Sequence, residues 1–270
     1  MNANLKSIIR RKLIPVALAA ACALAVSAEA AAQNIADLIK KGKVTIGVVS
    51  GAPPFGSVDA KGVPVGYDVD VANLIGKYIG LKVDVVPLTS PARIPALESG
   101  KVDFLVATMA PTPERAKVVM FSNPYNAFEL SIIGPTGSKL KTMADLGKKK
   151  VGVPRGTTQD TALTRLAVAG TNIVRFEDDA TTAQALLSGQ VDAVALPNIS
   201  AADIVKTRGA GKIELKFGFA LQPNSMALRK DQFELHQWLN NFIYYVKQNG
   251  ELDAIARKWT GNALPPLPAM

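Results

Sequence analysis

The chain has 270 residues, of which 48% are hydrophobic and 20% are charged, so it is long enough to bury a sizeable core. Its 31 basic and 22 acidic residues give a net charge of +9, but no run of Lys and Arg is interleaved with aromatic residues, which argues against nucleic-acid binding. One Cys and one His are too few for a disulfide scaffold or a His/Cys metal cluster.

Residues 1–32 are predicted to be a secretory signal peptide. Four basic residues precede an apolar segment from Leu13 to Val26, and small residues then offer cleavage after Ala30 or after Ala32. The apolar segment is shorter than the about 20 residues that a membrane anchor needs. Cys22 lies inside it, so a lipid attachment site remains an alternative. Removal of the peptide leaves 27 basic and 21 acidic residues, a net charge of +6, on a protein expected in the periplasm.

The mature chain is predicted to alternate between helices and strands. In its first half, helices are expected at 35–41, 66–80 and 91–97, with strands at 44–49, 82–87 and 104–107. In its second half, strands are expected at 151–153, 173–176, 191–196 and 226–228, with helices at 142–146, 155–169, 181–187, 200–207, 232–247 and 250–259. This alternation is typical of an α/β protein with largely parallel sheets.

An internal repeat predicts two lobes. The segment Ala96–Ala107, ALESGKVDFLVA, is echoed by Ala185–Ala195, ALLSGQVDAVA. Each copy is interpreted as a helix end, a Gly C-cap and a short buried strand. One large sheet that repeats a common turn is the alternative, but the matched order of elements around both copies favours two lobes.

The chain is expected to cross between the lobes twice, near 125–129 and near 220–224. Lobe 1 then comprises residues 33–127 and 222–262, lobe 2 comprises residues 128–221, and residues 263–270 form a disordered tail. Two crossings allow a hinge, and ligands bind between the lobes of such proteins.

The segment around Arg115 is the first candidate anion site. Thr112 is a favourable N-cap, Pro113 fits the first helical position, and Arg115 follows on the same turn. A guanidinium beside free backbone N–H groups suits a carboxylate. The alternative is a surface turn whose Arg points to water. Thr157 and Thr158 open a later helix and form a second candidate, with simple N-capping as the alternative.

Several motifs in fixed order resemble one family. They are Gly66–Asp70, Ile94–Leu97, Gly100–Asp103, Thr112–Arg115, Phe121–Ser122, Gly156–Thr158, and Asn249–Gly250 with Trp259. Together they are similar to the polar amino-acid-binding proteins of ABC importers, the bacterial extracellular solute-binding proteins of family 3, over residues 35–262. The resemblance implies the two-lobed type II periplasmic-binding-protein fold, in which each lobe is a mostly parallel sheet with flanking helices and two strands form the hinge.

The resemblance also implies roles for individual residues. Arg115 would hold a ligand carboxylate, helped by Thr108 and by backbone N–H groups near Ala110. Further ligand contacts are expected from Thr157 and Thr158 in lobe 2, from Ser50 and Ala52 in the wall of lobe 1, and from Arg93, which we place at the cleft mouth beside the ligand side chain. A solvent-facing Arg93 is the alternative.

Three positions depart from the family pattern. Ala52 replaces an aromatic residue that stacks on the ligand, and Ala110 lacks a hydroxyl. Pro197 stands where an Asp usually pairs with the ligand ammonium, and a buried ammonium without such a partner is unfavourable. Either another acid or Asn198 serves, or the ligand is not an ordinary α-amino acid. Arg93, Ala52 and Pro197 together favour an acidic ligand over Lys, Arg or His.

The sequence therefore predicts a monomer without cofactor, metal or catalytic residues. It would capture a small carboxylate-bearing solute, an acidic amino acid or a related organic acid, and deliver it to an ABC permease. The alternative is an enzyme on the same fold, similar to cyclohexadienyl dehydratase, which would consume prephenate or arogenate.

Overall fold

A computed structural model describes residues 35–268 of the chain. The predicted signal peptide at 1–32, including Cys22, lies outside the described residues. No helix within 35–268 has the length and apolar character needed to cross a bilayer.

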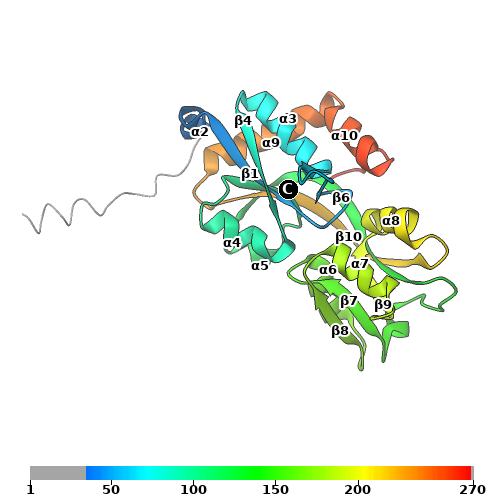
Figure 1. The fold of residues 1–270 in the computed structure, drawn as a ribbon. Helices are drawn as coiled ribbons and strands as arrows, with labels where there is room; N and C mark the ends of the chain where they lie inside the picture. Colours follow the sequence, from blue (N-terminus) through cyan, green and yellow to red (C-terminus); the bar gives the residue numbers. More distant parts are fainter. Residues whose placement is uncertain (1–34, 269–270) are drawn as a thin grey trace, which may run out of the picture. The chain divides into compact units, whose positions relative to one another are not determined.

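Eight strands form one mixed sheet (Figure 1). Their order is β4 (Lys82–Leu88), β1 (Lys43–Val49), β5 (Phe104–Met109), β10 (Ile213–Leu228), β6 (Met120–Pro135), β9 (Ala193–Pro197), β7 (Lys150–Pro154) and β8 (Asn172–Phe176). The three strands at each end of this order run parallel within their group, whereas the central pair runs antiparallel. A short hairpin of β2 (Ser57–Val58) and β3 (Pro64–Val65) is separate. The expected α/β architecture with two parallel groups is confirmed.

Strands β6 and β10 connect the two parallel groups. Each is 16 residues long, and the two pair along most of their length. The predicted crossings fall opposite one another in this pair, where Ala127 faces Pro223 and Phe128 faces Gln222. The sequence predicts a strand at 226–228 and a hinge strand at the second crossing, and the structure joins both in one continuous strand, β10.

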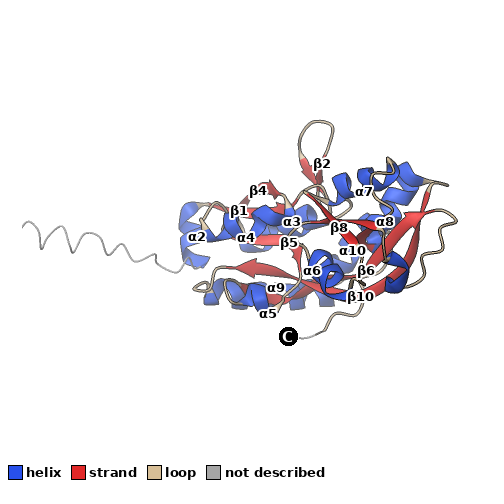
Figure 2. Cartoon of the chain, turned by 90° about the horizontal axis from the view of Figure 1, so that it is seen from below, coloured by secondary structure: helices blue, strands red, loops and turns tan. Residues whose placement is uncertain are grey.

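Helices cover both faces of the sheet (Figure 2). Their bounds are α2 (Ile35–Lys41), α3 (Tyr67–Ile79), α4 (Arg93–Glu98), α5 (Pro113–Ala116), α6 (Thr158–Leu166), α7 (Asp179–Leu187), α8 (Asn198–Ile204), α9 (Phe233–Gln248) and α10 (Glu251–Thr260). Short 3₁₀ turns lie at Ser90–Ala92 and Met143–Leu146, and a π-helical turn at Val205–Gly209 extends α8. Helix α3 packs against the first parallel group and α7 against the second.

The core follows the strand pattern. One cluster of buried side chains surrounds β1, β5, α3 and α9. Strand β9 divides its side chains between two other clusters, with Val194 and Leu196 on one face and Ala193 and Ala195 on the other. This alternation is the period of two that a strand imposes, and a strand buried on both faces is expected to be apolar throughout.

The internal repeat is also a structural repeat. The side chain of Asp103 accepts the Thr45 N–H at 2.7 Å, and its own N–H donates to the Thr45 carbonyl at 2.8 Å. Asp192 does the same to Lys150, at 2.8 Å in both bonds. Asp103 therefore fixes the turn that leads into β5, and Asp192 fixes the turn that leads into β9.

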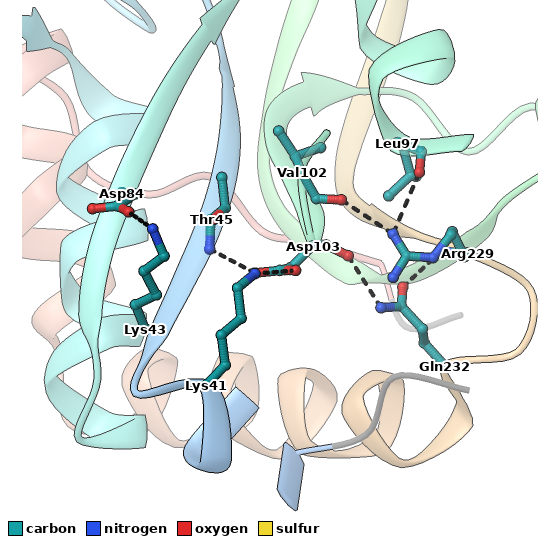
Figure 3. A network of polar contacts seen from close by, with 9 residues as sticks. All are labelled: Lys41, Lys43, Thr45, Asp84, Leu97, Val102, Asp103, Arg229 and Gln232. Atoms are coloured by element: carbon teal, nitrogen blue, oxygen red, sulfur yellow. Dashed lines mark hydrogen bonds and ion pairs between the residues drawn. The ribbon is translucent and has the colours of Figure 1, made fainter. Parts of the chain in front are cut away.

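Other side chains extend the first of these turns (Figure 3). The Lys41 ammonium from α2 lies 3.1 Å from the Asp103 carboxylate. From the far end of the chain, Gln232 donates to the Asp103 carbonyl at 3.1 Å and Arg229 to the Val102 carbonyl at 3.1 Å. The turn thus joins α2, β1 and the entrance to α9.

The C-terminal segment contacts α10. The backbone N–H of Leu264 donates to the Asp253 carboxylate at 2.8 Å, and the Leu264 side chain packs against the large core cluster.

Candidate functional site

A small polar cavity lies where loops from the two parallel groups meet. Six of the predicted site residues line it, namely Ala52, Arg93, Thr108, Arg115, Thr157 and Thr158. The other lining residues are Val49, Phe55, Ser90, Phe128, Gln159, Asp179, Pro197 and Gln222. The cavity volume is about 20 Å³, roughly the space of one water molecule. A larger ligand therefore requires the surrounding loops to move apart.

Three predicted site residues lie outside this lining. The Ser50 backbone N–H donates to the Leu88 carbonyl at 2.8 Å. Ala110 is buried, and its carbonyl accepts from the Arg115 guanidinium at 3.1 Å. The Asn198 side chain accepts the Glu129 N–H at 3.2 Å and so holds α8 against β6. The structure does not bring Asn198 to the cavity as a substitute for the missing acid.

Arg115 points inward rather than to water. Its helical turn forms as the sequence predicts, because the Thr112 hydroxyl accepts the Arg115 N–H at 3.3 Å and Pro113 occupies the first turn. Its guanidinium donates from Nη1 to the Ala110 carbonyl at 3.1 Å and from Nη2 to the Gly156 carbonyl at 2.9 Å. Burial lowers the pKa of Arg115 to about 10, so the group stays charged at neutral pH.

Arg93 is not at the cleft mouth, and that placement was wrong. Its side chain is 3% exposed, with Nε 2.9 Å from the Ser90 carbonyl and Nη1 2.8 Å from the Ala107 carbonyl. These carbonyls, at the end of β5 and in the turn before α4, replace water as acceptors and permit burial. Burial, and then the charge of Arg115, lower the pKa of Arg93 to about 9. Within residues 35–268, Nη2 makes no hydrogen bond, which leaves it as a donor at the cavity wall.

Thr108 is held in a strained conformation by a buried relay. Its φ angle is 42°, which is rare for a β-branched residue and costs on the order of 1–3 kcal/mol. Its N–H donates to the Tyr125 hydroxyl at 2.8 Å, and that hydroxyl donates to Asp68 at 2.7 Å. Burial raises the pKa values of Asp68 and Tyr125 well above their ordinary ranges. The relay fixes the backbone where β5 reaches the cavity.

On the opposite wall, the two threonines differ in role. Thr157 caps α6, since its hydroxyl accepts the Asp160 N–H at 3.2 Å and donates to the Pro154 carbonyl at 2.7 Å. The Thr157 side chain therefore acts as a simple N-cap, which was the alternative to an anion site. The Thr158 hydroxyl donates to Gln222 on β10. The start of α6 is thus tied to one of the two connecting strands.

The cavity does have an aromatic wall, contrary to the expectation from Ala52. Phe55 lies three residues further along the same loop, and its ring is 5.2 Å from that of Phe128, tilted by 49°. Both rings line the cavity. The sequence pattern did not show that Phe128 on β6 would bring a second ring to Phe55.

Asp179 is the functional candidate that sequence reasoning missed. The predicted helix began at Thr181, whereas α7 begins at Asp179 and is capped by Asp178, whose side chain accepts the Thr181 N–H at 2.8 Å. Asp is a favoured N-cap residue, so Asp178 would have indicated this start. Asp179 is 4% exposed and lines the cavity. Burial raises its pKa to about 7, and the Ser200 hydroxyl and the Arg93 charge offset this only in part.

Two contacts join the walls around the cavity. One is the Arg115–Gly156 hydrogen bond, and the other is donated by the Ala180 N–H to the Gly51 carbonyl at 2.9 Å.

The residues that line the cavity supply two guanidinium groups, one carboxyl group and two aromatic rings. Such a set can hold an anion and a cation at separate points of one small molecule.

Comparison with known sequences agrees with this arrangement. The family described as bacterial extracellular solute-binding proteins, family 3, matches residues 44–262. The L-cystine-binding protein TcyJ of Escherichia coli (strain K12) is 29% identical and aligns over 82% of this chain and 84% of its own. The ABC transporter glutamine-binding protein GlnH of Bacillus subtilis (strain 168) is 32% identical over 86% of each chain.

A solved structure shows the same fold. The crystal structure of the ancestral amino acid-binding protein AncCDT-1, a precursor of cyclohexadienyl dehydratase, superposes with a TM-score of 0.78. It is 33% identical, and the match covers 84% of this chain and 99% of that one. The predicted two-lobed fold is confirmed by this match.

Proposed function

Because this chain belongs to the bacterial extracellular solute-binding proteins, family 3, we propose that it captures a small carboxylate-bearing amino acid for an ABC permease. Capture takes place in the periplasm after removal of residues 1–32, and the protein acts as a monomer. Its lobes, 33–127 with 222–262 and 128–221, close over the solute. The observation that carries the proposal is the inward-facing Arg115 guanidinium in a cavity between two walls.

In the bound state the ligand carboxylate takes the place of the Gly156 carbonyl on Arg115. A carboxylate offers two oxygens to the guanidinium fork, whereas a backbone carbonyl offers one. Exchange of this partner is consistent with the small volume of the cavity, since the walls must separate to admit a ligand.

An acidic side chain is the preferred ligand feature. Arg93 has a second guanidinium in the same cavity, and its Nη2 is unused by residues 35–268. A second carboxylate there would neutralise a buried charge that is held in place by two backbone carbonyls. A cationic side chain would instead meet two positive groups.

A melting-shift screen of the mature protein over the amino acids and small carboxylic acids tests this function. L-Glutamate, L-aspartate or a small diacid should raise Tm in a concentration-dependent manner, and the Arg115→Ala variant should show no shift. Stabilisation by L-arginine or L-lysine in place of the acidic compounds would contradict the acidic preference. Equal shifts in the wild type and in Arg115→Ala would contradict the carboxylate site.

A dehydratase is the second candidate, because a buried carboxyl group with a raised pKa, Asp179, lies in the cavity and can act as a general acid. The structural match to a protein described as a precursor of cyclohexadienyl dehydratase makes this worth testing. Incubation with prephenate or arogenate separates the two functions. A stable complex without loss of the compound supports binding, and its consumption supports the enzyme.

A further inference from the structure

The cavity has donors for carboxylates but only one group that can accept from an ammonium and carry a compensating charge. Among the residues that line it, Asp179 is the sole acid, and Pro197 offers no charge. Asp68 lies behind Thr108 and is engaged by the Tyr125 hydroxyl. An α-amino acid carries an ammonium as well as a carboxylate, and a buried ammonium needs a charged or strongly polar acceptor.

Capping of α7 does not explain Asp179. The N-cap of α7 is Asp178, whose carboxylate takes the Thr181 N–H at 2.8 Å. Asp179 is nevertheless 96% removed from solvent, and among residues 35–268 it forms no ion pair. Arg93 lines the same cavity, and its charge favours the Asp179 carboxylate, but the two groups form no ion pair. A buried carboxyl group that faces a cavity without such a pair can accept a cation from outside.

We infer that Asp179 binds the ammonium group of the captured ligand and so selects amino acids over their des-amino analogues. This inference rests on the proposed capture of a carboxylate-bearing solute. Arg115 then takes the α-carboxylate, and Asp179, from the opposite wall, takes the ammonium on the same carbon. Pro197, at the end of β9, cannot provide a carboxylate for the ammonium. Asp179, at the start of α7, provides it instead.

Charged groups around Asp179 make this contact depend on pH. Arg93 faces it across the cavity and favours the carboxylate, whereas Asp178, its neighbour on α7, disfavours it. Without ligand, burial keeps the carboxyl group protonated up to about pH 7. An ammonium ligand requires the ionised form, so its binding releases a proton below that pH. A des-amino analogue requires no such ionisation.

The alternative is that Asp179 only stabilises the first turn of α7 through its charge. This role would change the stability of the protein but not its choice between two ligands that differ by one ammonium. The ratio of affinities for L-glutamate and glutarate, or for L-glutamine and glutaramate, therefore separates the two roles.

The experiment is calorimetry of the wild type, Asp179→Asn and the control Asp231→Asn, which changes an exposed Asp just before α9. Asp179→Asn should lose affinity for L-glutamate and L-glutamine by about 30-fold or more, as expected when one partner of a buried charged pair is removed. Its affinity for glutarate and glutaramate should change by less than about threefold. The Asp231→Asn control should match the wild type.

A second measurement does not depend on the folding of a variant. The wild-type affinity for L-glutamate should fall about tenfold between about pH 8 and about pH 6, whereas the affinity for glutarate should hold or rise. An Asp179→Asn protein that binds both amino acids like the wild type, or a pH-independent L-glutamate affinity, would overturn the assignment of Asp179. If the wild type binds none of the four compounds, the proposed preference for acidic ligands fails, and if Arg115→Ala still binds them, the proposed carboxylate site at Arg115 fails.

Discussion

Arg115 donates from Nη2 to the carbonyl oxygen of Gly156 at 2.9 Å, which joins α5 to the turn before α6. The same guanidinium is the proposed carboxylate site. Its partner in this structure is therefore a neutral oxygen, and a ligand carboxylate would replace it with a charged one. A charge-assisted, two-oxygen contact is stronger than a bond to one amide oxygen.

Removal of this guanidinium should abolish capture. Arg115→Ala is expected to lower the affinity for the bound amino acid by about 2–5 kcal/mol, or roughly 30-fold to several thousand-fold. Arg115→Lys should recover only part of the loss, because an ammonium has no planar fork. Calorimetry measures both, with Arg208→Ala as a control at an exposed position. Wild-type affinity in Arg115→Ala would remove the main support for the function.

Arg93 should decide between ligand side chains. Arg93→Met removes one cavity guanidinium, and with it the expected partner of a side-chain carboxylate. Because Arg93 also holds the Ser90 and Ala107 carbonyls, every ligand will bind more weakly. The informative quantity is the ratio of affinities, which should shift from L-glutamate toward L-glutamine by about tenfold or more. An unchanged ratio in competition calorimetry would assign Arg93 a purely structural role.

Stability at different pH values should report Asp179 directly. Its pKa rises from an ordinary value of 3.8 to about 7 in the folded state. The folded protein therefore binds a proton that the unfolded chain releases between about pH 4 and pH 7. In this window the free energy of unfolding should decrease as pH rises, by as much as about 4 kcal/mol, and then level off.

Urea unfolding of the ligand-free protein at several pH values tests this linkage. Asp179→Asn should show a shallower downward slope than the wild type between about pH 5 and pH 7, because the buried Asp68, whose pKa is also raised, still contributes. The exposed control Asp231→Asn should keep the full wild-type slope. Parallel profiles for the wild type and Asp179→Asn would mean that Asp179 does not carry a raised pKa.

Local rules were sufficient for most elements of the fold. Pro113 and Thr112 mark the start of α5, and the two Gly–x–Val–Asp turns mark the entrance to β5 and β9, because capping and turn chemistry depend on neighbours in sequence. The same rules did not show that β10 runs without a break from Ile213 to Leu228 through Pro223. That residue is accommodated since the strand pairs with β6 across the molecule, a contact that no local pattern contains.

The site was harder to predict where contacts with residues distant in the sequence determine the position of a side chain. Arg115, Thr108 and Thr158 reach the cavity as the motifs imply. The position of Arg93 at the start of its helix predicts a place at the cleft mouth, but the acceptors that bury its guanidinium are the nearby Ser90 carbonyl and the Ala107 carbonyl of β5, which is 14 residues away. Asp179 was overlooked because the predicted start of α7 was two residues too late.

The relay behind Thr108 should matter for stability more than for ligand chemistry. Tyr125→Phe removes a hydroxyl that serves both the Thr108 N–H and Asp68, and leaves both groups buried without this partner. The expected cost is about 2 kcal/mol or more, or roughly 4–8 °C in Tm. Tyr244→Phe, on an exposed side chain of α9, is the matched control and should change Tm little. Equal Tm values for the two variants would contradict a structural relay.

Closure of the walls can be tested at Gly51, whose carbonyl accepts the Ala180 N–H. Its φ angle is +71°, and an added Cβ would lie 2.4 Å from the Asp178 carboxylate. The Asp178 side chain cannot turn away freely, because it caps α7. Gly51→Ala should therefore prevent the loop after β1 from contacting the start of α7. It should disfavour any state in which these two walls of the cavity are in contact.

Gly62→Ala is the control for the strain at Gly51. Gly62 has a φ angle of +77°, but its added Cβ would meet nothing within 4 Å. Both variants carry the cost of a left-handed Ala, on the order of 1 kcal/mol, and only Gly51→Ala adds the clash. We expect Gly51→Ala to bind L-glutamate about tenfold or more weakly than Gly62→Ala in calorimetry, and to show a smaller ligand-induced decrease of the radius of gyration in X-ray scattering. If the two variants bind and compact alike, the contact between Gly51 and α7 is not part of the ligand-bound state, and the hinge closure proposed for this protein must bring other surfaces together.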